Sequence, residues 1–213
     1  MIILDNVSLR IKKVQILEDI SLELEDGQIH GLVGRNGCGK TMLMKCICGF
    51  VCPTGGRIQV NGKYVGEETD FPEHLGVMIE TPGFIPYLSG YENLRILAGC
   101  RKMIGKKEIR DAMKQVELDP DSRLHVKKYS MGMRQRLGIA QAIMEHPWLL
   151  VLDEPFNGLD EDAVRMVRNL LDEKREHGVT IVLSSHNAED IRLLCDSVHR
   201  LSKGRLCTPD PPG

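Results

Sequence analysis

Residues 34–41 read GRNGCGKT and match the pattern G-x-x-x-x-G-K-[ST]. They follow a strand-like run, QIHGLVG, and precede an apolar helical pattern, MLMKCICGF, which is the strand-loop-helix setting that this pattern requires. Gly34, Gly37 and Gly39 let backbone amides curl around phosphate oxygens, and the following helix adds free N–H groups and the positive end of its dipole. The segment predicts a phosphate-binding loop. A glycine turn with an incidental lysine is the other interpretation, and the flanking strand and helix disfavour it.

Side chains of this loop have expected chemical roles. Lys40 should hold the β and γ phosphates of a bound nucleotide, and Thr41 should ligate magnesium through its hydroxyl. Cys38 lies beside Lys40 at a helix start, a setting that favours the thiolate, so we expect it to be the most reactive cysteine. The nucleotide is expected to contact Gly34, Arg35, Asn36, Gly37, Cys38, Gly39, Lys40, Thr41 and Met42.

A second apolar run, WLLVLDE over residues 148–154, ends in two carboxylates. This places Asp153 and Glu154 at the carboxyl end of a strand, where α/β sheets bind ligands. Asp153 suits magnesium, a hard ion that prefers oxygen ligands. Glu154 is the candidate base that polarises a water attacking the γ-phosphate. An apolar strand ending in Asp-Glu is weak evidence alone, because many such pairs begin a solvated loop, but beside a phosphate-binding loop it is specific.

The composition limits the classes of protein to which the chain can belong. It has 213 residues, a formal net charge of −2 and a pI of about 6.4, so no basic excess recruits nucleic acid or anionic lipid. Its longest apolar runs fall short of the roughly 20 residues that span a bilayer. The N-terminus, MIILDNVSL, shows no secretory leader. We expect one cytoplasmic domain with no nucleic-acid partner.

Short strand-like runs alternate with helical patterns, which predicts an α/β fold. WLLVLD and VTIVLSS are continuously apolar, as parallel strands buried on both faces are, and residues 160–176 between them form an amphipathic helix that stops at His177-Gly178. Residues 81–145 show several helices and no strong strand. Ser89 and Glu92 form a capping box, which predicts a helix start there.

The seven cysteines have two interpretations. Cys46, Cys48 and Cys52 cluster in KCICGFVC and could suggest a metal site, but none of the paired spacings of zinc sites occurs. Cys46 and Cys48 fall in an apolar helical stretch, where free thiols behave as small hydrophobic groups. We expect them to be structural.

These motifs and their order resemble the ATP-binding cassette family from end to end. The segment YSMGMRQRLGIAQAI is similar to the family's signature, LSGGQ followed by a helix, and keeps Ser130 and Gly132. The resemblance implies that these residues touch the γ-phosphate bound to a second subunit. Met131 and Met133 depart from the pattern, which puts polar contacts near the ribose in doubt.

Three further positions gain roles from the resemblance. NGLD, ending at Asp160, resembles the D-loop, and SSH ends at His186, which is expected to sense the γ-phosphate. The family stacks an aromatic residue on adenine near position 11, where this chain has Ile11. An aliphatic residue there implies loose selectivity for the base.

The segment HLGVMIETPGFIPYLSGYENL resembles a narrower branch, the cassettes of bacitracin and lantibiotic exporters, because Glu80 replaces the family's glutamine. The resemblance implies that Glu80 contacts magnesium and couples the nucleotide to membrane helices. Phe84, Tyr87 and Tyr91 follow it. They are expected either to line a groove for a helix of a membrane subunit or to pack the helical region.

The resemblance implies a P-loop NTPase (RecA-like) core with an antiparallel β subdomain and an α-helical signature subdomain. The expected boundaries are a single domain over 1–213, with the core and β subdomain in 1–79 and 146–207, the helical subdomain in 80–145 and a disordered tail in 208–213. It also implies ATP and Mg²⁺ as cofactors, a second ATPase subunit, most simply an identical copy, and an integral membrane permease that holds the chain at the inner face of the membrane.

Three functions remain open at this point. The first is the ATP-hydrolysing motor of a transporter, with a peptide antibiotic or another amphiphile as cargo. The second is a soluble cassette outside transport, which is disfavoured because the chain has neither a second cassette nor a long coiled coil. The third is an inactive ATP-binding module, and the presence of Lys40, Asp153, Glu154 and His186 together argues against it.

Overall fold

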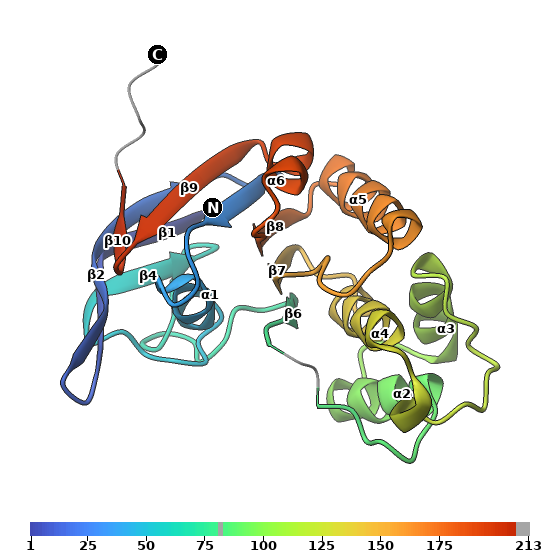
Figure 1. The fold of residues 1–213 in the computed structure, drawn as a ribbon. Helices are drawn as coiled ribbons and strands as arrows, with labels where there is room; N and C mark the ends of the chain where they lie inside the picture. The colour runs from blue at the N-terminus through green and yellow to red at the C-terminus, as the bar shows by residue number, and fades with distance from the viewer. Residues whose placement is uncertain (81–82, 208–213) are drawn as a thin grey trace.

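The computed structural model describes residues 1–80 and 83–207, which form two sheets and surrounding helices (Figure 1). The first sheet is antiparallel, with the strand order β2-β1-β4-β5. Its strands are β1 (Ile2–Ile11), β2 (Val14–Leu24), β4 (Gly55–Val60) and β5 (Lys63–Tyr64). Residues 208–213, which the sequence analysis expected to be a disordered tail, lie outside the described residues.

The second sheet carries the candidate site. Its order is β10-β9-β3-β8-β7-β6, and all neighbouring pairs except β10 with β9 are parallel. Because parallel strands here are covered on both faces, their apolar runs are continuous rather than alternating. The strands are β3 (Ile29–Val33), β6 (Leu75–Met78), β7 (Leu149–Asp153), β8 (Thr180–Ser184), β9 (Ser197–Ser202) and β10 (Arg205–Leu206).

The helices fall into two groups (Figure 1). Helix α1 lies between the two sheets, while α2 to α6 contribute buried apolar residues to the cluster on the opposite face of the parallel sheet. The bounds are α1 (Lys40–Ile47), α2 (Gly90–Arg101), α3 (Lys106–Gln115), the 3₁₀ turn η1 (Val126–Lys128), α4 (Met131–Ile143), α5 (Glu161–Glu176) and α6 (Ala188–Leu194).

Two buried apolar clusters hold these layers together. One joins the antiparallel sheet to the parallel sheet through α1, whose Leu43, Met44 and Ile47 are fully buried. The other packs the helical region against the opposite face of the parallel sheet, and its fully buried members include Leu137 of α4 and Leu152 of β7. The parallel sheet is thus packed on both faces, and this packing fixes the positions of the carboxyl ends of its strands.

Two helix boundaries follow the sequence rules. Ser89 caps α2 by accepting a hydrogen bond from the Glu92 amide, and the Glu92 carboxylate accepts one from the Ser89 amide at 2.8 Å, which confirms the predicted capping box. Asp160 caps α5, and the helix ends at His177 as predicted. Strand β2 was not predicted. Its residues VQILEDISLEL pair with β1 in a hairpin whose turn places Lys12 at a positive φ of 55°.

Across the described ranges, 1–80 and 83–207, we find no helix with the length and apolar character that a bilayer crossing demands.

A chain of polar contacts lies inside the parallel sheet. His30 of β3 is 1% exposed, and its Nδ1 lies 2.7 Å from Ser197 Oγ while its Nε2 lies 2.8 Å from the Glu25 carbonyl. The Nε2 of His199 lies 3.0 Å from the same serine oxygen. Burial lowers the pKa of both histidines below their ordinary range, because the charged imidazolium is poorly solvated there.

This burial predicts a loss of stability on mild acidification. An unfolded histidine takes up a proton near its ordinary pKa of about 6.5, whereas folded His30 stays neutral to lower pH. The free energy of unfolding should therefore fall as the pH drops through about 6.5 toward 5. Glutamine cannot titrate, so the free energy of unfolding of His30→Gln, measured by urea unfolding at pH 7, 6 and 5, should fall less steeply than that of the wild type. The exposed His125→Gln is the control; equal slopes for His30→Gln and wild type would contradict the prediction.

Candidate functional site

The glycine loop runs from the carboxyl end of β3 to the first residue of α1. Gly39 precedes α1 at φ 112°, and a Cβ there would lie 2.8 Å from a methyl carbon of Leu17. Gly37 adopts φ 76° and has open space beside it, so its backbone faces outward. Both positions favour glycine because residues with a Cβ rarely adopt this region. The loop thereby presents main-chain amides at the start of α1.

Lys40 and Thr41 lie where the loop meets the helix. Lys40 is 7% exposed, and its Nζ donates a hydrogen bond to the Gly34 carbonyl at 2.8 Å, so the ammonium crosses the loop. Thr41 Oγ1 donates to Asp153 Oδ2 at 2.6 Å. The hydroxyl and the carboxylate that the sequence analysis assigned to one metal ion are thus neighbours, although 112 residues separate them.

Ser184 is a site residue that the sequence analysis missed. It ends β8 beside Asp153, and its hydroxyl donates to Asp153 Oδ1 at 2.6 Å while accepting the Glu154 amide at 3.0 Å. The sequence did contain a pattern that could have identified Ser184, because VTIVLSS was predicted as a buried strand whose carboxyl end falls at this serine. Both oxygens of Asp153 are therefore oriented by hydroxyl donors.

Glu154 follows directly and adopts φ 51°, an uncommon conformation for a residue with a Cβ. Its Oε2 accepts the His186 amide at 3.2 Å and lies 2.8 Å from His186 Nδ1. Gln135 of α4 donates to the Glu154 carbonyl at 2.9 Å and was also missed. The structure brings Glu154 and His186 together and joins them to the helix that follows the signature.

These groups surround a hollow of about 440 Å³, whose lining residues are Ile16, Asn36, Gly37, Gly39, Lys40, Thr41, Met42, Asp153 and Glu154. Gly34, Arg35, Cys38 and Ile11, which were expected to contact this chain's own nucleotide, are not among them, and neither are Ser130, Gly132 and Asp160 of the signature and D-loop. Ile11 is 43% exposed at the end of β1, and Ile16 of β2 stands at the hollow instead. Ile16 was missed because β2 was missed.

The signature and D-loop residues lie at two helix starts. Ser130 caps α4, its Oγ accepting the Met133 amide at 3.1 Å, and Asp160 caps α5 by accepting the Ala163 amide at 2.9 Å. A Cβ on Gly132 would lie 3.0 Å from the Gly158 carbonyl, so the two segments touch closely. The exposed Met131 side chain lies over Gly158.

Glu80 does not line the hollow and pairs with a lysine. Its Oε1 lies 2.6 Å from Nζ of Lys45, a residue of α1 that the sequence analysis did not single out. Phe84 and Tyr91 pack against the helical cluster, whereas Tyr87 is 67% exposed with Lys127 over its ring. Across the described residues, no three His, Cys, Asp or Glu side chains gather to hold a metal.

The cysteines require one correction. Cys38 is 7% exposed and points into the protein toward Gly34, while Cys52 and Cys100 are exposed. We therefore no longer expect Cys38 to be the most reactive thiol. Burial raises the pKa of Cys46 and of Cys48 to about 12, which agrees with their interpretation as apolar packing groups.

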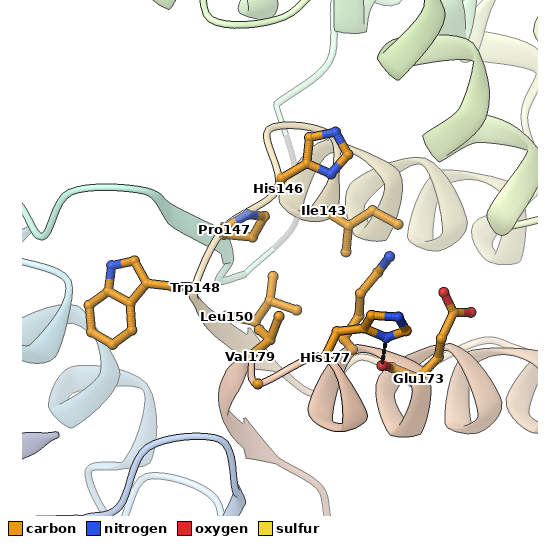
Figure 2. A pocket seen from close by; sticks show the side chains of 10 residues that line it. Ile143, His146, Pro147, Trp148, Leu150, Glu173, His177 and Val179 are labelled. Atoms are coloured by element: carbon orange, nitrogen blue, oxygen red, sulfur yellow. Dashed lines mark hydrogen bonds between the residues drawn. The ribbon is translucent and has the colours of Figure 1, made fainter.

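A separate hollow of about 370 Å³ lies at the amino ends of β7 and β8, the opposite edge of the sheet from Asp153 (Figure 2). Pro147 and Val179 line it, and His146 and His177 stand over it, with His177 Nδ1 2.7 Å from the Glu173 carbonyl. It contains none of the residues that the sequence predicted for the site.

Comparison with known proteins matches residues 17–157 to the family described as ABC transporter. An ABC transporter ATP-binding protein of Bacillus subtilis is 40% identical over 96% of this chain and 94% of its own length. This chain belongs to the ABC transporter family. The bacitracin transport ATP-binding protein BcrA of Enterococcus faecalis is 39% identical to this chain. The match covers 95% of this chain and 66% of the length of that relative. The lantibiotic transport ATP-binding protein SrtF of Streptococcus pyogenes is 32% identical, over 97% and 89% of the two chains.

Solved structures agree on the fold. The cassette MJ0796, in a dimeric post-hydrolysis state with ADP and Pi, superimposes with a TM-score of 0.87 at 21% identity, covering 97% of this chain and 96% of that one. An ATP-binding subunit of an ABC transporter gives the same TM-score at 27% identity, over 97% and 88%. The expected P-loop NTPase fold and the resemblance to the bacitracin and lantibiotic branch are confirmed, and the chain is a nucleotide-binding ATPase cassette of the family.

Proposed function

We propose that this chain is the subunit of a membrane transporter that binds and hydrolyses ATP with Mg²⁺. The observation that carries the proposal is the convergence of Lys40, the Thr41–Asp153 pair and Glu154 at one hollow, with His186 in contact with Glu154. An inactive binding module would not need a base with its histidine partner beside the phosphate loop. The proposal also covers the transported cargo, the partner subunits and the location of the chain, which are argued below.

The donor set fits magnesium. Thr41 and Asp153 offer hard oxygen ligands at 2.6 Å from each other, and Mg²⁺ is commonly held by one or two carboxylates together with substrate phosphates and waters. Ser184 orients the second oxygen of Asp153. The ion would neutralise charge on the β and γ phosphates. Glu80 is a further candidate ligand in this proposal.

The chain's own residues would divide the remaining work. Lys40 would release the Gly34 carbonyl and hold the phosphates. Glu154 would accept the proton of the attacking water, and His186 would keep its carboxylate in place through the contact at 2.8 Å. Ser130 and Asp160 are exposed at the starts of α4 and α5, so an identical second copy could meet them across its own nucleotide.

A groove of about 520 Å³ supports a membrane partner. Phe50 and Phe71 are 51% and 54% exposed at its rim, with ring centroids 6.0 Å apart, and Leu97 of α2 faces them. Exposed aromatic side chains beside a groove are typical of helix recognition. We assign it to a cytoplasmic helix of the permease, in place of Phe84, Tyr87 and Tyr91. This would hold the chain at the inner face of the membrane, with a peptide antibiotic or another amphiphile as cargo.

Two measurements test the proposal. Purified protein should release phosphate from ATP, and chelation of Mg²⁺ should stop the release. When the chain is expressed together with a candidate permease, a polytopic membrane protein from a neighbouring gene, the two should co-purify. Phe71→Asp should reduce recovery of the membrane protein by about tenfold or more, a loss of about 1.4 kcal/mol in binding, while the exposed Val14→Asp should not. Phosphate release without co-purification would favour the soluble, non-transport cassette.

A further inference from the structure

Two carboxylates of this fold occupy matching positions at the carboxyl edge of the parallel sheet. Glu154 follows β7 and Glu80 follows β6, and both adopt the left-handed conformation, at φ 51° and φ 60°. This conformation is disfavoured for residues with a Cβ and persists where surrounding contacts hold it. Each carboxylate has one basic partner in the described part of the chain, His186 for Glu154 and Lys45 for Glu80.

Lys45 is the anchored member of its pair. Its side chain is 23% exposed and rises from α1, whose neighbouring residues Met44 and Cys46 are buried, whereas the Glu80 side chain is 63% exposed. The Nζ–Oε1 distance is 2.6 Å. The lysine therefore determines where the carboxylate lies, rather than the reverse.

The position of Lys45 on α1 relates the pair to the metal ligands. Residues four apart lie on one face of a helix, so Lys45 stands one turn along α1 from Thr41. Thr41 is engaged with Asp153, and Glu80 is engaged with Lys45 instead of joining them. Glu80 is thus paired with a lysine that stands on the same helix as Thr41, and it does not line the hollow.

We propose that Lys45 is a positioning residue that competes with Mg²⁺ for the Glu80 carboxylate. Lys45, which holds Glu80, stands one helical turn from Thr41 on α1. With Mg²⁺ and ATP bound, the Glu80 carboxylate would have a second possible partner, and it would pair either with the Lys45 ammonium or with the metal. This inference rests on the proposed function, because it requires Mg²⁺ and ATP at Thr41 and Asp153.

The exchange has a measurable consequence. Lys45→Met removes the competitor and leaves the carboxylate free for the metal. The Mg²⁺ concentration that half-saturates binding of a non-hydrolysable ATP analogue should fall about two- to fivefold, the range that an exposed ion pair supplies. Calorimetric titration of the complete chain measures it, and a parallel titration of the analogue in EDTA separates the metal effect from any direct effect of Lys45 on phosphate.

Three variants control the experiment. Lys45→Arg keeps the charge and should restore the wild-type Mg²⁺ requirement. In the Glu80→Gln background, Lys45→Met should produce no further change, because the carboxylate for which it competes is absent. Lys63→Met breaks a comparable exposed pair, in which Lys63 Nζ lies 2.8 Å from Glu73 Oε1 away from the hollow, and should leave the requirement unchanged.

The outcomes separate this inference from the proposed function. A lowered Mg²⁺ requirement in Lys45→Met that disappears in the Glu80→Gln background supports the exchange. An unchanged or raised requirement, or an equal shift in both backgrounds, overturns it while binding of the analogue with Mg²⁺ by the wild type still upholds the proposed function. No binding of the analogue by the wild type would overturn both.

Discussion

Replacing Glu154 by glutamine is expected to reduce ATP turnover by at least about a hundredfold, the lower bound for a positioned general base. The amide keeps the shape of the side chain and can still accept the His186 amide hydrogen bond, which Glu154 Oε2 accepts at 3.2 Å. It cannot accept a proton from the attacking water. Binding of ATP should persist, because Lys40 and the glycine loop are untouched, so a dimer that contains ATP should accumulate.

Phosphate release and sizing chromatography with ATP check this expectation. Glu176→Gln, an exposed carboxylate at the end of α5 and away from the hollow, is the matched control and should keep wild-type turnover. Wild-type turnover in Glu154→Gln would remove Glu154 from the role of base. A variant that binds ATP but elutes only as a monomer would count against the two-subunit arrangement.

The parts of the site that lie within continuous motifs could be predicted from the sequence. Residues 34–41 and the pair Asp153 and Glu154 follow strands, and parallel strands place their carboxyl ends at one edge of the sheet. The capping box at Ser89 could be predicted for the same reason, because its residues lie three positions apart in the sequence. The boundaries 1–79, 80–145 and 146–207 remain a prediction, although the helices α2 to α4 do occupy the middle of the chain.

The remaining contacts depend on tertiary packing that no local pattern contains. Ser184 faces Asp153 only because β8 pairs with β7 in that register, and Lys45 meets Glu80 only because α1 packs against the parallel sheet. Cys38 followed a valid local rule, since it is at a helix start beside a lysine, but the turn directs its side chain inward. The local sequence therefore indicates the backbone position of Cys38 correctly but does not determine the direction in which its thiol points.

Beside His186, a buried ion pair ties α5 to α6. Asp190 is 1% exposed, and its Oδ1 accepts Arg168 Nε at 3.1 Å and a second hydrogen bond from the same guanidinium. Its Oδ2 accepts the Ser185 hydroxyl at 3.0 Å, and Ser185 in turn accepts the Asn187 amide at 3.1 Å. The pair therefore braces the loop that carries His186 from both sides.

Asp190→Ala should lower the free energy of unfolding by about 3 kcal/mol, because it leaves the largely buried Arg168 without a counter-charge. Urea unfolding of the variant measures the loss. Asp121→Ala removes the partner of Arg110 in an exposed pair, so its free energy of unfolding should be close to that of the wild type. Arg168→Met combined with Asp190→Leu should recover part of the loss, because apolar groups replace both buried charges. If Asp190→Ala unfolded at the wild-type urea concentration, the pair would not brace the His186 loop.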